Sequence, residues 1–469
     1  MNRRPYASLY QTNFSRLTER TLTREAESYG SLVYTLRIKP NWVYKSDVQV
    51  SLENLKERFT LGSGTSANED SLRQSVRQRY KNIGIFQQVN GLVAKDFYWE
   101  GSLGFTYTEA RLAPQVRLLA NERLENISLG LYRLHGLFVE TTFKKTWKFL
   151  RSLVASRLRY VYGEYNQDEA ARLLWERRLS LSVNSRFAES VKYNMEAFYN
   201  REYTFLKPAQ LYPGSLFTDF RSVSSYDAAV GTPQVEDLIG FSFKVRDLKK
   251  SKLTYHSSGA YVWAKNILFE SLSFEQDRLN IQQIQGSTRR DLFINSSLDK
   301  YFPVLKTTVK LSHEYLNSTV PQVIEGVKDR VFLQQHTLGF VSGTVFKGGV
   351  TLSLGAKQHV YHNRWQDSRT DFSYQSYVFK TGAKPIPALG VSLGLQVANF
   401  GKNQGGLTPL MEAKAKYDSK NGQFSLSLDL SNLLNRGAAV ISSLGNTLFS
   451  STRYPLLNRF FLLSGKYKF

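Results

Sequence analysis

The sequence predicts an all-β fold, a transmembrane antiparallel up-and-down β-barrel of roughly 18–22 strands with short periplasmic turns and long external loops. Three observations predict it. Apolar and polar residues alternate along most of the chain, short and long connections follow the alternating segments in turn, and aromatic residues make up 13% of the chain. Because successive side chains of a strand point to opposite faces, this alternation gives each strand one apolar and one polar face. We therefore expect one barrel domain over residues 1–469.

Composition excludes several other classes. Hydrophobic residues make up 42% of the chain, and no uncharged apolar run reaches the ~18 residues that a membrane-spanning helix needs. The chain has no cysteine, which excludes disulfides, zinc-thiolate sites and a thiol nucleophile. The amino-terminal segment MNRRPYASLYQTNFSRLTER has arginines but no apolar core after them, so it is not a secretory signal peptide.

The net charge is strongly positive, at +23. Such a balance is typical of nucleic-acid-binding proteins. The basic residues are spread along the chain, however, and do not gather in one tail or segment. This distribution favours a solvated surface or polar lumen that also meets anionic lipid head groups.

The clearest pair of strands is the hairpin MEAKAKYDSKNGQFSLSLDL, residues 411–430. Asn421-Gly422 marks its turn, because both residues tolerate positive φ. On each side of the turn, apolar residues alternate with charged or hydroxyl residues. Strands of about 9–15 residues are long enough to cross a bilayer when tilted. The same alternation occurs at residues 177–187, 189–200, 304–315 and 389–397.

The connections of the second half alternate between two lengths, as in outer-membrane barrels. Short turns are expected near Phe302-Pro303, Lys347-Gly348-Gly349, Pro385-Ile386-Pro387 and Asn421-Gly422. Longer polar stretches occur at 317–329, 362–370, 400–408 and 432–457. The last long stretch belongs to the external series, so the final strand should run inward and place Phe469 at the periplasmic rim. A soluble β-sandwich is the alternative, but its turns would recur about every 8–12 residues.

The parity of the strands predicts which basic side chains face the lumen. A Lys or Arg that faces lipid near the midplane costs roughly 2–4 kcal/mol, so inward placement is favoured. These side chains would form a passage or plug-docking surface for anionic or polar groups, or would simply be hydrated lumen residues. The predicted lumen-facing residues are Lys306, Lys310, Lys414, Lys416, Lys466 and Lys468.

The longest external loops are predicted at residues 54–82 and 206–236. Binding residues concentrate on loops held by a rigid scaffold. Aromatic residues lie among polar ones in the second loop and could contact a ligand, or could pack the loop on the barrel mouth. These ligand candidates are Tyr212, Phe217, Phe220 and Tyr226.

Enzymatic chemistry has little support, and we predict no catalytic, cofactor or metal site. His359 and His362 are three residues apart, which places them on opposite faces of a strand. Ser312 and Glu314 likewise point away from the face of His313 between them. Neither arrangement predicts a metal site or a hydrolase, so we expect a protein that is not an enzyme.

The end of the chain resembles a known family. The segment from residue 424 to 469 contains Asn432-Leu433-Leu434-Asn435 after the penultimate strand, and a final strand that carries Arg459, Leu462, Tyr467 and Phe469. It is similar to the barrel end of TonB-dependent receptor-like outer-membrane proteins of the Bacteroidetes type. The resemblance implies that Tyr467 and Phe469 form the signal read by the barrel-assembly machinery.

The resemblance also implies a transport function in the bacterial outer membrane. Such receptors bind a solute at external loops and pass it through the lumen of a barrel of about 22 strands, which a plug domain fills. No plug or TonB box is visible, so we expect an amino-terminally truncated barrel whose partners include a plug, TonB, outer-membrane lipid, lipopolysaccharide and, as in some relatives, a surface lipoprotein. Two alternatives stay open: a passive pore or structural barrel without energy coupling, and a soluble basic β-protein that binds nucleic acid.

Overall fold

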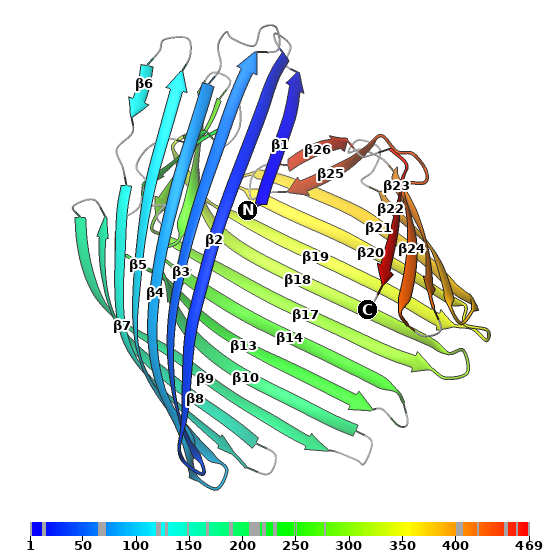
Figure 1. The fold of residues 1–469 in the computed structure, drawn as a ribbon, viewed down its shortest axis with the longest axis horizontal. Coiled ribbons are helices and arrows are strands. Elements are labelled where there is room, and N and C mark those ends of the chain that lie inside the picture. Colours follow the sequence, from blue (N-terminus) through cyan, green and yellow to red (C-terminus); the bar gives the residue numbers. More distant parts are fainter. Residues whose placement is uncertain are drawn as a thin grey trace.

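The computed structural model is built of β-strands and the turns between them (Figure 1). Among the residues that the structure describes, no helix is long and apolar enough to cross a membrane. The described residues are 2–11, 16–63, 72–118, 123–126, 130–147, 150–165, 168–186, 191–205, 216–217, 222–227, 232–247, 249, 251–275, 278–399, 407–419, 422–444, 449–455 and 458–467.

Most strands follow one another in a single antiparallel meander, in which each pairs with the next. The meander consists of β1 (Asn2–Gln11), β2 (Arg16–Lys39), β3 (Trp42–Ser63), β4 (Leu72–Ala94), β5 (Phe97–Leu118), β7 (Gly130–Thr146), β8 (Leu150–Tyr165), β9 (Asp168–Arg186), β10 (Val191–Thr204), β13 (Gln234–Asp247), β14 (Leu253–Lys265), β17 (Thr288–Phe302), β18 (Thr307–Ile324), β19 (Val327–Val345), β20 (Thr351–Trp365), β21 (Ser368–Ile386), β22 (Leu389–Asn399), β23 (Leu407–Asp418), β24 (Phe424–Ser431) and β27 (Phe460–Tyr467).

Shorter strands lie inside the connections. They are β6 (Arg123–Asn126), β11 (Leu216–Phe217), β12 (Ser222–Asp227), β15 (Leu268–Glu275), β16 (Arg278–Gln285), β25 (Ala438–Leu444) and β26 (Phe449–Pro455). The main sheet has 25 strands, and five of these are connection strands, which leaves 20 in the meander. β25 and β26 pair only with each other, in a two-stranded sheet. The predicted all-β, antiparallel, up-and-down fold is confirmed, and the strand number lies within the predicted range.

The two faces of the meander differ as the alternation predicts. Leu181, Met195 and Phe241 lie on one face and are 49%, 49% and 48% exposed. Val161 and Leu174 lie on the other face and are 2% and 6% exposed. Burial on one face of a single sheet follows when the sheet curves toward that face, and Figure 1 shows this curvature. We call the concave face the inner face and the apolar convex face the outer face.

The connections at one end of the meander are two to five residues long. Gly348, Gly349 and Gly422 adopt φ values of 87°, 78° and 68° in two of these turns, a conformation that favours glycine. The four short turns predicted in the second half are found at 303–306, 346–350, 387–388 and 419–423. Asn421 itself lies outside the described residues.

The connections at the other end are more varied than predicted. Residues 317–329 and 362–370 are not loops, because each is mostly strand and closes in a two-residue turn. The predicted loop 54–82 is too long: residues 54–63 belong to β3 and 72–82 to β4, and the connection at 64–71 lies outside the described residues. Strands reach 24 residues in β2, beyond the predicted length. The physical reason is that the residues of these strand ends are largely polar, and polar residues without alternation are compatible with both a strand and a loop.

The meander is open along one line. β1 and β27 are its first and last strands, and among the described residues no pairing joins them. Within the described part of the chain, each of them therefore pairs with a neighbouring strand along one edge only. A sheet that crosses a lipid bilayer has no water to satisfy unpaired backbone N–H and C=O groups within the hydrocarbon region.

Candidate functional site

A network of charged side chains covers the inner face of β7 to β10. Glu140 comes from β7, Arg157 and Arg159 from β8, and Glu176 from β9. Charged residues at every second position of a strand share one face. The outward positions between them hold residues such as Leu158, which is 48% exposed on the outer face.

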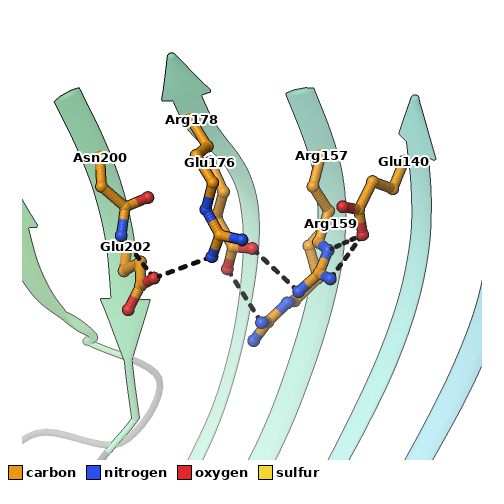
Figure 2. A network of polar contacts seen from close by, with 7 residues as sticks. All are labelled: Glu140, Arg157, Arg159, Glu176, Arg178, Asn200 and Glu202. Carbon is orange, nitrogen blue, oxygen red and sulfur yellow. Dashed lines mark hydrogen bonds and ion pairs between the residues drawn. The ribbon is translucent and has the colours of Figure 1, made fainter. Parts of the chain in front are cut away.

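The strand register brings opposite charges together in this network. Arg157 lies directly opposite Glu140 on one side and Glu176 on the other. Its Nη2 lies 2.5 Å from Glu140 Oε2, and its Nη1 lies 3.3 Å from Glu176 Oε2. Arg159 Nη2 lies 2.9 Å from the second oxygen of Glu176. One arginine therefore joins three adjacent strands (Figure 2).

The network continues onto β10 with weaker contacts. Arg178 Nη2 lies 3.5 Å from Glu202 Oε1, and Asn200 Nδ2 donates to the same oxygen at 2.5 Å. Both side chains of this pair are more than half exposed, whereas Glu176 is only 12% exposed. Ion pairs that are shielded from water interact more strongly than exposed ones. The Arg157 cluster should therefore hold the strands together more firmly than the Arg178 pair.

Phe138 supports the central arginine. The guanidinium of Arg157 lies 4.9 Å from the centre of the Phe138 ring, a cation–π geometry. The ring extends over Gly104, where an added Cβ would lie 2.2 Å from its atoms. Glycine at this position therefore leaves the room that the ring needs under Arg157.

Four of the six predicted lumen lysines lie on the inner face. Lys414 Nζ lies 2.7 Å from Asp429 and Lys416 Nζ lies 2.9 Å from Asp418, so aspartates neutralise these two lysines. Lys310 and Lys466 face the same side, opposite Asp299 and Ser425. Lys306 is not in a strand as the parity argument assumed: it lies in the turn between β17 and β18 with φ 47°, and β18 begins at Thr307. Lys468 lies outside the described residues.

Comparison with known proteins identifies the architecture. No family model and no curated protein matches the sequence. The pyoverdine outer membrane receptor FpvA from Pseudomonas aeruginosa matches 97% of the chain, at 10% identity and a TM-score of 0.56. The ferric-catecholate import receptor Fiu from Escherichia coli matches 98%, at 11% identity and 0.51, and the ferric yersiniabactin uptake receptor FyuA from Yersinia pestis matches 97%, at 10% and 0.50. The chain has the fold of an outer-membrane receptor barrel.

The chain spans only part of the length of each receptor. The chain covers 62% of FpvA, 65% of Fiu and 62% of FyuA, which is less than two thirds of each. At these identities the likeness concerns the fold, and no individual residue can be transferred. The site on the receptor-barrel fold must therefore be argued from its own side chains.

The predicted external-loop candidates lie in the connection between β10 and β13. Tyr212 and Phe220 lie outside the described residues. The backbone of Phe217 is in β11 and that of Tyr226 in β12, and β12 runs parallel to β16. Their role in ligand binding stays a prediction. The predicted loop at 206–236 corresponds to the connection between β10 and β13. This connection contains the short strands β11 and β12, and β13 begins at Gln234.

Tyr467 lies in the last strand, β27. Tyr467 is opposite Phe424 and 56% exposed on the outer face, at the short-turn end of the meander. Phe469 lies outside the described residues. The histidines follow the predicted parity: His359 stacks on Tyr374 on the inner face, and His362 Nδ1 contacts Asp371 on the outer face.

Two clusters of side chains on the inner face were not predicted from the sequence. The first is the arginine–glutamate network, whose signal is the repeated spacing of two residues in Arg157-x-Arg159 and Glu176-x-Arg178. The second is an aromatic cluster near the 366–367 turn, where the Tyr361 and Phe372 rings lie 5.8 Å apart and the His359 and Tyr374 rings 4.3 Å apart. Such a cluster offers flat apolar surfaces beside polar groups at the end of the lumen with the longer connections.

Proposed function

We propose that the chain is the barrel of a TonB-dependent receptor-like transporter in the bacterial outer membrane. The observation that carries this proposal is a 20-strand meander with an apolar outer face and a charged, ion-paired inner face. Porins of about 16–18 strands leave an open channel, whereas barrels of about 22 strands are transporters with a plugged lumen. The fold likeness to solved outer-membrane receptors supports the same conclusion.

In this proposal, the end with the longer connections faces outward and binds the solute. The aromatic cluster of Tyr361, Phe372 and Tyr374 would contact it at the mouth of the lumen. The network around Arg157 on the inner face would meet either water or the polar surface of a plug domain. Charged groups that face a plug can pair with it, and a plug moved by TonB would open the path. The broad apolar outer face favours this membrane assignment over a soluble nucleic-acid-binding protein.

Further partners belong to the same proposal. Outer-membrane lipid and lipopolysaccharide would surround the outer face, and a surface lipoprotein would cover the external mouth, as the Bacteroidetes-type resemblance implies. In a bilayer the free edges of β1 and β27 must be satisfied, so they would pair with each other or with further strands.

The gene itself tests the receptor assignment. We expect a plug domain and a TonB box to be encoded upstream of the codon for Met1. A complete signal peptide joined directly to this chain, without a plug, would overturn the receptor assignment and leave a passive pore. Reading the genomic sequence decides between the two.

The assembly signal gives a separate prediction. Removing Phe469, or replacing Tyr467 by serine, should lower the amount of folded protein in the outer membrane severalfold, because the barrel-assembly machinery would read the closing strand less well. Heat-modifiable mobility on a gel measures the folded fraction in outer-membrane extracts. Replacing Ser464, which faces inward on the same strand, by alanine is the control. Equal yields for all variants would show that these aromatics are not the signal.

A further inference from the structure

The outer face carries a second charged cluster, directly behind the inner-face network. Arg177 precedes Arg178 in the sequence and therefore points to the opposite face of β9. In the register, Arg177 is opposite Arg201 on β10, and Arg201 is opposite Asp237 on β13. Two arginines that face each other across adjacent strands repel, which destabilises the pair unless negative charge is near.

Asp237 neutralises only the second arginine. Arg201 donates two hydrogen bonds to the carboxylate, from Nε to Oδ1 at 2.7 Å and from Nη2 to Oδ2 at 2.8 Å. The hydroxyl of Tyr199 also donates to Oδ1, at 2.7 Å. Both oxygens of Asp237 are thus occupied by this bidentate pair and its tyrosine.

Arg177 has no such carboxylate. Across the described part of the chain, no acidic side chain lies within ion-pair distance of it, and its buried Nε has no hydrogen-bond partner. Its guanidinium lies over the Trp175 ring, 3.7 Å from the ring centre. The ring is held in turn by a hydrogen bond from Trp175 Nε1 to Ser156 Oγ at 2.6 Å. Among the described residues, Arg177 is therefore a positioned cation without a paired carboxylate.

The position of the cluster indicates what could bind it. Along β9, the outward residues that follow Arg177 toward the short-turn end are apolar, beginning with Leu179 and Leu181. Trp175 and Trp263 are 51% and 38% exposed at the level of the cluster, as in the aromatic girdle of a membrane barrel. Lys265 Nζ lies 4.4 Å from the Trp263 ring and adds positive charge. The cluster thus lies where the head groups of the external leaflet would meet the barrel.

We propose that Arg177, Arg201 and Trp175 form a binding site for a phosphate of an outer-leaflet glycolipid. Phosphate oxygens match the planar donor array of arginine, and the Arg177 guanidinium is already held on the Trp175 ring. The acyl chains of the lipid would lie along the apolar side chains below. The inference rests on the outer-membrane placement of the proposed function, but not on transport, a plug or TonB.

Native mass spectrometry of the detergent-purified full chain tests the site. The probe is diphosphorylated lipid A, compared with the same lipid after phosphate removal. One surface arginine contributes about 1 kcal/mol to anionic lipid binding, so R177Q should bind the phosphorylated lipid about fivefold more weakly. The matched control is R178Q, whose arginine faces the inner side and pairs with Glu202, and which should bind as the wild type does.

The results of this experiment distinguish failure of the lipid site from failure of the proposed function. Equal weakening in R177Q and R178Q, or equal binding of the lipid with and without phosphate, would overturn the site while leaving the receptor barrel intact. If the folded wild type bound neither lipid, the membrane placement itself would fail, and the proposed function with it. If R177Q does not fold, R177M keeps the aliphatic stem on Trp175 without the charge, and the same fivefold loss is expected.

Discussion

Replacing Leu181 by arginine should lower the free energy of unfolding by about 2–4 kcal/mol, the cost of a lipid-facing cation near the midplane. Leu181 is 49% exposed on the outer face, where it is opposite Ala197 on β10. A surface with this exposure would tolerate arginine in water, so the predicted loss depends on lipid. Denaturant titration of the chain folded into phospholipid vesicles measures it.

Ser182 provides the control for this substitution. It follows Leu181 directly but faces inward, opposite Glu196. S182R should therefore change the free energy of unfolding little, since its cation would lie in the hydrated lumen near a carboxylate. Equal losses in L181R and S182R would contradict the assignment of the two faces.

Replacing Arg157 by alanine should cost about 1–3 kcal/mol, because it removes hydrogen bonds to two carboxylates that are partly shielded from water. Glu140 would be left without its cation, while Glu176 would keep Arg159. The same vesicle titration measures this loss. Replacing Arg157 and Glu140 together, by methionine and glutamine, should recover part of it, because no unpaired carboxylate then remains at position 140.

R178A is the matched comparison within the same network. Its pair with Glu202 is longer, at 3.5 Å, and both side chains are exposed. We expect a loss of about 0–1 kcal/mol, as for other surface ion pairs. A loss in R178A as large as that in R157A would show that the inner-face network does not depend on the shielding of Glu176.

The sequence predicted the fold because the signal for a membrane strand is local. In β23 and β24, alternation and the turn at Asn421-Gly422 are enough to predict a hairpin, and the structure pairs Tyr417 with Leu426 on one apolar face. The signal failed at 317–329 and 362–370, where strands extend beyond the apolar band. Polar residues there are compatible with both a strand in water and a loop. The amino-acid sequence alone therefore does not distinguish the two structures.

The charged network could not be predicted in the same way. Alternation shows that Arg157 and Glu176 face the polar side of their strands, but not that they are opposite each other. Whether Arg157 and Glu176 are opposite each other depends on the register of β8 against β9. The pairing along the whole hairpin determines this register. Lys306 illustrates the limit: its parity is that of Lys310, yet it falls in a turn because the strand begins at Thr307.

Cysteine labelling along β9 tests the two-faced membrane barrel most directly, because the chain has no cysteine of its own. Single cysteines would be placed from Leu179 to Val183 and exposed to a water-soluble maleimide in outer-membrane vesicles. We predict labelling at positions 180 and 182, which lie on the inner face, and protection at 179, 181 and 183, which lie on the outer face. Uniform labelling of all five positions, or labelling of the odd ones alone, would contradict the membrane barrel.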